Sequence, residues 1–157
     1  MIKSIIALVC IGLLMVGCSS NSKNESFGKK ESSQIMNVET SHFDKYTSEQ
    51  TNTAYVVKGR VNQENDENAV VIMIHAEENA TVSIQGTLTK NSGGDTALTY
   101  VSPDGEKTKI ADNSSEILDT TIKILKGDGK VIFIGESAVY DFEIHFEMTD
   151  GVSFSDL

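Results

Sequence analysis

The chain has 157 residues, a formal net charge of −10 and 39% hydrophobic residues, which suits one domain with flanking segments. Its acidic surplus excludes general nucleic-acid binding and predicts repulsion from anionic lipid headgroups. The two cysteines, Cys10 and Cys18, lie near the N-terminus. Beyond them there can be no disulfide, cysteine nucleophile or cysteine-ligated metal. We therefore expect an acidic domain that is stabilised by its apolar core alone.

The first residues have the pattern of an export signal. Lys3 supplies one positive charge, and an apolar run of 12 residues follows from Ile5 to Val16. A helix of that length rises about 18 Å, whereas the hydrocarbon core of a bilayer is about 30 Å thick. The run is too short to span a membrane and has the length of a signal-peptide core.

The next residues resemble a known processing site. Met15-Val16-Gly17-Cys18 resembles a lipobox, the cleavage site of bacterial lipoprotein signal peptides, although leucine is usual where Met15 stands. The resemblance implies that residues 1–17 are removed and that the Cys18 thiol receives a diacylglyceryl group, whose two acyl chains give stable membrane attachment. We expect a lipid anchor at Cys18 on the extracytoplasmic face of the cell membrane. An uncleaved membrane anchor and an ordinary secretory signal are the alternatives.

Residues 18–50 are mostly polar and predict a disordered tether that carries the lipidated Cys18. The sequence leaves open a short helix near 41–49. Ser41-His42-Phe43-Asp44 resembles a capping box, and Phe43 and Tyr46 could form one apolar edge of such a helix.

Residues 51–149 alternate short apolar runs with turn residues. The alternation is clearest where Tyr140, Phe142, Ile144 and Phe146 are separated by polar residues. The predicted strands are about 54–61, 69–76, 80–89, 96–101, 107–111, 117–125, 131–134 and 140–148. Eight strands at spacings of about 8–12 residues predict an all-β fold. We expect an antiparallel β-sandwich of about 7–8 strands, of jelly-roll or Ig-like type, with residues 150–157 as a C-terminal tail.

Two turns stand out within this region. Ser102-Pro103-Asp104-Gly105 and Lys126-Gly127-Asp128-Gly129 have strong turn composition. Over residues 80–148, their order among the predicted strands resembles a recurring type of small lipoprotein in low-GC Gram-positive bacteria. That resemblance implies a β-sandwich fold and does not imply any activity.

Histidines and nearby carboxylates are the first candidates for a site. Glu143, His145 and Glu147 share one face of the last predicted strand and could bind a divalent metal, the alternative being a solvated strand face. His75 is expected to be a core or strand-end histidine. His42, near the tether, is interpreted as incidental.

The acidic loops and the aromatic residues suggest two further binding functions. Three acidic pairs could supply oxygen ligands to calcium, although none matches an EF-hand and an acidic surface produces such pairs by chance. These pairs are Asp66 with Glu67, Glu77 with Glu78, and Asp112 with Glu116. A sugar-stacking platform is disfavoured because the chain has no Trp and Tyr55, Tyr100 and Tyr140 are predicted to face the core. Only Tyr46 and Phe154 remain for such a role.

The sequence shows no nucleophile elbow, phosphate-binding loop or dinucleotide fingerprint. We therefore predict no catalytic residue, no cofactor and no resident metal. The expected function is a membrane-anchored, non-catalytic binding module of the cell envelope, with an envelope protein as partner and no nucleic acid. The alternatives are an envelope-acting enzyme that uses acidic residues such as Glu143, Glu147 or Asp112, and a structural spacer lipoprotein.

Overall fold

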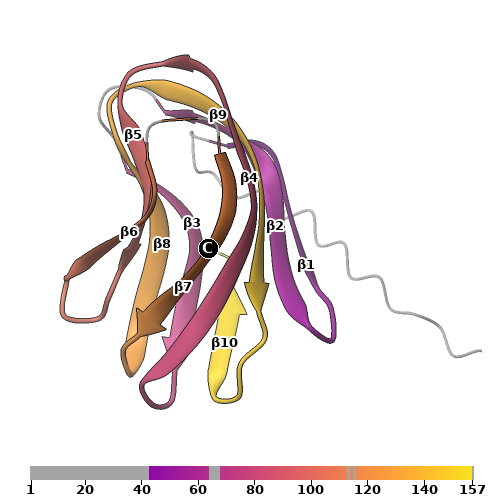
Figure 1. The fold of residues 1–157 in the computed structure, drawn as a ribbon, viewed down its shortest axis with the longest axis vertical. Coiled ribbons are helices and arrows are strands. Elements are labelled where there is room, and N and C mark those ends of the chain that lie inside the picture. Colours follow the sequence, from indigo (N-terminus) through magenta and orange to yellow (C-terminus); the bar gives the residue numbers. More distant parts are fainter. Residues whose placement is uncertain (1–42, 64–67, 113, 115, 157) are drawn as a thin grey trace, which may run out of the picture. The chain divides into compact units, whose positions relative to one another are not determined.

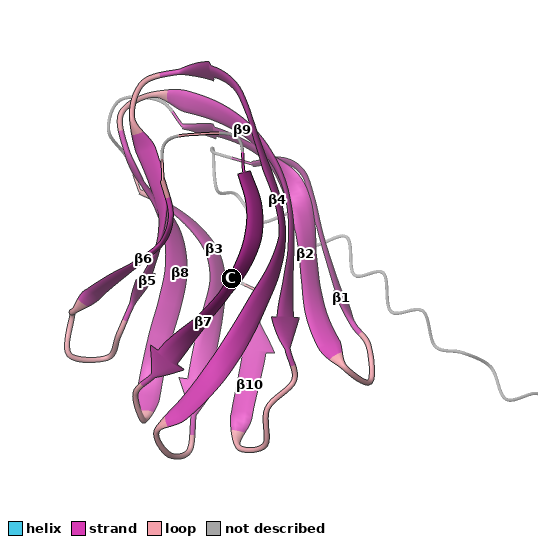
Figure 2. Cartoon of the chain, in the orientation of Figure 1, coloured by secondary structure: helices cyan, strands magenta, loops and turns pink. Residues whose placement is uncertain are grey.

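A computed structural model describes residues 43–63, 68–112, 114 and 116–156, which form strands and turns without a helix (Figure 1, Figure 2). The strands are β1 (Phe43–Gln50), β2 (Ala54–Gln63), β3 (Ala69–Ala76), β4 (Ala80–Gly93), β5 (Thr96–Val101), β6 (Lys107–Ala111), β7 (Glu116–Ile124), β8 (Gly127–Gly135), β9 (Ala138–Glu147) and β10 (Val152–Ser155). Within these ranges, no helix is long and apolar enough to cross a bilayer.

The strands form two five-stranded antiparallel sheets. Sheet A has the order β1-β2-β9-β4-β7, and sheet B has the order β10-β3-β8-β5-β6. The predicted all-β sandwich is therefore confirmed.

The strand pairs are nested in the sequence. β5 pairs with β6, β4 with β7, β3 with β8 and β2 with β9, so each pair encloses the previous one along the chain. Nested antiparallel pairs that divide between two sheets form a jelly roll. Of the two architectures that the sequence left open, the topology is that of the jelly roll, with β1 and β10 added at one edge of each sheet.

The predicted domain start at residue 51 and the short helix near 41–49 are wrong for the described residues, because Phe43–Gln50 form β1. The register slips between Asp44 and Thr47, where Lys45 has a φ of 59°. The bulge inserts an extra residue, so Phe43 and Tyr46 both pack against the core although they are three positions apart. A bulged strand thus reproduces the spacing of a helix.

The predicted C-terminal tail at 150–157 is also wrong in part, since Val152–Ser155 form β10. Val152 is buried and Phe154 packs against the core cluster. Four residues are too few for alternation to reveal a strand. With β1 and β10, the described part of the chain has ten strands, where the sequence predicted 7–8.

The predicted turn at Gly127-Asp128-Gly129 is the beginning of β8. Gly129 faces inward, and a Cβ atom there would lie 2.7 Å from Cε2 of Tyr100 on the neighbouring strand. Gly127, with a φ of 112°, allows the bend that precedes the strand. These glycines therefore provide room and curvature at a strand end.

The core lies between the two sheets, as predicted for β9. Tyr140, Phe142, Ile144 and Phe146 are at most 4% exposed. The Phe142 ring lies 5.7 Å from that of Phe133 on sheet B, joining the inner faces of the two sheets.

Candidate functional site on the outer face of sheet A

Alternate residues of sheet A point away from the core and form a surface that we call the polar face. Its positions follow from the strand registers, because side chains opposite one another on paired strands share a face. The polar face contains Asp44, Thr47, Glu49, Val56, Lys58, Arg60, Thr81, Ser83, Gln85, Thr87, Thr89, Ile117, Asp119, Thr121, Lys123, Asp141, Glu143, His145 and Glu147.

One charge cluster on this face is centred on Asp141. Arg60 donates two hydrogen bonds to the carboxylate, from Nε to Oδ1 at 2.7 Å and from a terminal nitrogen to Oδ2 at 2.9 Å. Asn91 donates a third from Nδ2 to Oδ2 at 2.9 Å. The hydrogen bonds from Arg60, and then that from Asn91, lower the pKa of Asp141 to about 2. Asp141 is therefore an ionised, oriented group on the surface.

A second cluster is centred on Glu143. Its Oε1 lies 2.9 Å from His145 Nε2 and 3.0 Å from Lys58 Nζ. The hydrogen bond with His145, followed by that with Lys58, lowers the pKa of Glu143. Each carboxylate in the middle of the polar face is thus held by two neighbouring side chains.

The structure brings together two of the three residues proposed as metal ligands. Glu143 and His145 meet, but Lys58 already neutralises the Glu143 carboxylate. Within the described residues, no group of three or more His, Cys, Asp or Glu side chains is arranged to hold a metal ion. Glu147 therefore does not complete a metal site with the other two.

The remaining histidine and acidic candidates lie elsewhere. His75 is exposed near the end of β3, where its Nδ1 lies 2.6 Å from Asp128 Oδ1; it is a strand-end residue, one of the two positions predicted. Asp112 accepts a bond of 2.7 Å from Lys109 at the end of β6. Because Asp112 follows a strand of sheet B whereas Glu143 lies on sheet A, the two do not form one carboxylate pair.

Several sequence candidates lie outside the described residues, among them Cys18, His42, Asp66 and Glu67. Calcium binding by the pair at 66–67 therefore stays a prediction.

The aromatic residues face the core, as predicted for Tyr55, Tyr100 and Tyr140, which are at most 8% exposed. The interpretation of Tyr46 and Phe154 as loose side chains is wrong. Both pack against the core cluster.

Tyr46 belongs to a cluster that the sequence did not reveal, which we call the carboxylate latch. Asp156, just after β10, accepts hydrogen bonds at Oδ1 from the hydroxyls of Tyr46 and Tyr55, each at 3.0 Å, and at Oδ2 from Ser48. The Tyr46 hydroxyl also lies 2.8 Å from the carbonyl oxygen of Val71 on β3. Burial, with the Asp156 charge next, raises the pKa of Tyr46, so its hydroxyl stays protonated. The latch ties the edge of sheet A to sheet B.

Comparisons with known proteins give no family. No family model and no curated protein sequence matches the chain. Among solved structures, one named "BiXyn10A CBM1 APO" is similar at 10% identity and a TM-score of 0.35, covering 69% of this chain and 93% of that one. A cupin domain from Bordetella pertussis Tohama I is similar at 10% identity and a TM-score of 0.32, covering 69% and 95%.

Proposed function

We propose that the protein is a lipoprotein anchored through Cys18 to the extracytoplasmic side of the cell membrane, with a jelly-roll domain that acts as a non-catalytic binding module of the envelope. The lipobox residues 15–18 support the anchor. One observation carries the binding function: Asp141 and Glu143, adjacent on the outer side of β9, are each fixed by two neighbours. Preoriented polar groups lower the entropy lost when a partner binds.

The lowered pKa values of Asp141 and Glu143 favour binding over acid–base catalysis. A carboxylate pair that catalyses hydrolysis needs one member with a raised pKa, to hold a proton near neutral pH. Both carboxylates here are shifted downward. The enzyme alternative therefore has no support from this face.

The anchor is tested by Cys18→Ala, with Cys10→Ala as the matched control. We expect the Cys18 variant to accumulate as unprocessed precursor or to leave the membrane, because the acyl chains have no attachment site. The Cys10 variant should fractionate with the membrane like the unmodified protein. Processing and membrane retention of Cys18→Ala, assayed by fractionation and mass spectrometry, would contradict the lipidation proposal.

The binding function is tested by placing a photo-crosslinking residue at Thr87, in the middle of the polar face, and at Ser153, on β10 of sheet B. In native envelopes we expect one reproducible adduct from position 87 that position 153 does not give. A second variant, Gln85→Lys, adds bulk and charge beside position 87 and should remove that adduct. Identical adducts from both positions, or none from position 87, would favour the spacer alternative.

A further inference from the structure

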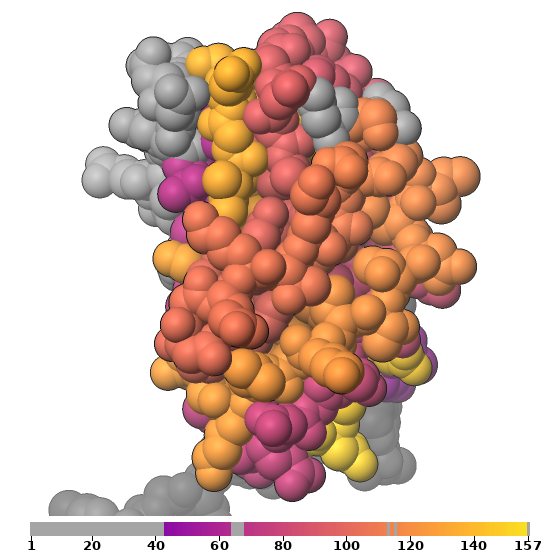
Figure 3. Space-filling model, turned by 60° about the vertical axis from the view of Figure 1, so that its left-hand side comes forward, coloured from indigo at the N-terminus to yellow at the C-terminus, as the bar shows by residue number. Residues whose placement is uncertain are grey.

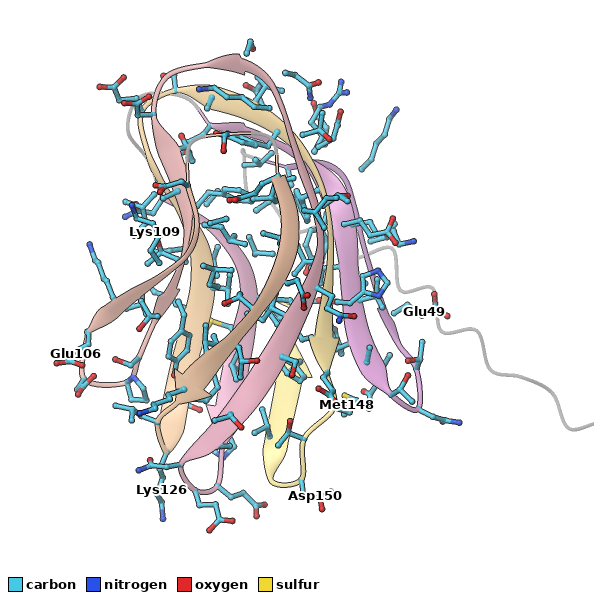
Figure 4. All side chains as sticks on the ribbon, viewed as in Figure 1. Glu49, Glu106, Lys109, Lys126, Met148 and Asp150 are labelled. Carbon is cyan, nitrogen blue, oxygen red and sulfur yellow. The ribbon has the colours of Figure 1, made fainter. Side chains whose placement is uncertain are left out.

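The outer face of sheet B differs in character from the polar face. Its positions again follow from the strand registers. We call it the lysine face, and it contains Val70, Met73, His75, Ala97, Thr99, Val101, Lys107, Lys109, Asp128, Lys130, Ile132, Ile134, Ser153 and Ser155. Figure 3 shows the β5–β6 hairpin, in coral, at the surface, and Figure 4 shows Lys109 pointing away from β6.

The centre of this face is apolar. Ile132 is 4% exposed and Thr99 is 6% exposed, although both point away from the core between the sheets, and Ile132 is not part of the core cluster. The aliphatic residues around them are half-buried. The solvent side of an antiparallel sheet is normally polar. Ile132 itself is covered by its neighbours, so the half-buried aliphatic residues around it are the apolar surface that this face offers to a partner.

Most charges on this face are positive. Lys107 and Lys130 form no ion pair with a described residue, and Lys109 pairs with Asp112 at its margin. The lysine face carries three lysines and one acidic residue, Asp128, whose carboxylate lies 2.6 Å from His75, whereas the polar face carries six acidic and three basic residues. A chain of net charge −10 thus presents one locally cationic side.

We propose that the lysine face docks on the surface of an anionic lipid bilayer, the membrane that holds the Cys18 anchor; this inference rests on the proposed anchoring. Lysines near an anionic surface are attracted to it, so three lysines against one aspartate give this side a modest net attraction. A tethered domain experiences its membrane at an effective concentration of about millimolar, so this modest attraction is sufficient.

The net negative charge does not prevent this contact. The two sheets of a sandwich are about 10 Å apart, and the Debye length at physiological salt is about 8 Å. Carboxylates on the polar face are therefore screened from a surface that touches the lysine face. The repulsion from anionic headgroups that the sequence predicts follows from the net charge of the whole chain. It does not describe the local charge of the lysine face.

The arrangement of residues on the lysine face favours a bilayer surface as its partner. Lys107 and Lys130 lie in one row across β6, β5 and β8, with Val101 between them. Lysine stems can lie along such aliphatic side chains while their ammonium groups reach a phosphate layer. This spread of charge over several strands matches a continuous sheet of phosphates.

The test uses the chain from Cys18 to the end, which contains every described residue. Cys18 is its only thiol, so it can be coupled to a maleimide phospholipid in vesicles of phosphatidylglycerol mixed with phosphatidylcholine, or of phosphatidylcholine alone. Lysine acetylation is read by mass spectrometry. We expect labelling of Lys107 and Lys130 to fall by at least about threefold on the anionic vesicles, and to recover at high salt. Lys58 and Lys123, on the outer side of sheet A, are internal controls.

Two matched variants complete the experiment. Lys107→Glu/Lys109→Glu should restore the labelling of Lys130 on anionic vesicles, and Lys58→Glu/Lys123→Glu should leave the protection intact. Equal labelling on both vesicle types would overturn the proposal. The proposal would also be overturned if Lys107 and Lys130 were protected only when polyglutamate is added, and not by anionic lipid. That result would assign the lysine face to an acidic polypeptide. Because the coupling is chemical, neither outcome bears on whether cells lipidate Cys18.

Discussion

The two outer faces of the sandwich are built from sheets of equal strand number, yet they differ in chemistry. The polar face orders its charges through contacts between strands, such as Arg60 with Asp141 and Lys58 with Glu143. The lysine face places aliphatic residues around Ile132 and leaves Lys107 and Lys130 without ion pairs among the described residues. Figure 4 labels one residue of each face, Glu49 on β1 and Lys109 on β6, at opposite sides of the view.

This difference predicts that the two surfaces contribute unequally to stability. The polar face keeps charged groups in water, where exposed ion pairs add little stability. The lysine face withdraws apolar surface from water, which contributes more. Substitutions on the two faces should therefore differ in their effect on the free energy of unfolding.

The largest effect is expected where both faces depend on the same side chain. Phe142 lies beneath the polar face, is 4% exposed and contacts Phe133 beneath the lysine face. Phe142→Ala should lower the free energy of unfolding by about 3–5 kcal/mol, because it leaves a cavity between the sheets. Urea denaturation measures this loss. A decrease below about 1 kcal/mol would mean that the two faces do not share this support.

The next effect separates the faces directly. Ile132→Ala should cost about 2 kcal/mol, at the low end for a buried isoleucine, because it removes covered apolar surface on the lysine face. Thr87→Ala, an exposed position on the polar face, should change stability by less than about 0.5 kcal/mol. Similar losses from the two variants in urea titrations would remove the energetic distinction between the faces.

A smaller effect concerns the latch that ties the two sheets together. Tyr46→Phe should cost about 1–2 kcal/mol, because the hydroxyl that bonds Val71 and Asp156 is removed from a partly buried site. Tyr55→Phe should cost less, since it loses only its bond to Asp156. A double-mutant cycle of Tyr46→Phe with Asp156→Asn should show non-additive losses. Strict additivity would show that the latch groups act independently.

The smallest effect is expected at Asp141. Asp141→Asn should cost less than about 1 kcal/mol near neutral pH, since the pair with Arg60 is about half exposed. Folding lowers the pKa of Asp141 from 3.8 to about 2, so its contribution is present above pH 3.8 and disappears as the pH falls towards 2. The stability difference between the unmodified protein and the variant should shrink over that interval. A difference that grows on acidification would have the wrong sign.

Much of the fold could be predicted because most strands are apolar alternations between turn residues. The bounds of β3, β5 and β6 were predicted to the residue. The bulge in β1 and the shortness of β10 hid the two added strands, since neither leaves a period of two in the sequence.

The candidate site was predicted only in part. Period-two spacing on one strand predicted that Glu143 and His145 share a face. The same spacing could not predict the contact between Arg60 and Asp141, which are 81 positions apart in the sequence. The alternation within a strand does not specify which residues of a distant strand pair with it. The apolar run at 131–134 likewise does not reveal that Ile132 faces away from the core.

The nested strand pairs have a consequence for how the chain reaches its structure. A connection of five residues joins β5 and β6, whereas β2 ends at Gln63 and its partner β9 begins only at Ala138. Closing long loops costs more entropy than closing short ones, and pairings between distant segments slow folding. We expect assembly to begin at the β5–β6 hairpin and to proceed outwards, pair by pair. A polypeptide synthesised from its N-terminus would then complete the pair of β2 and β9 only after β9 has been made.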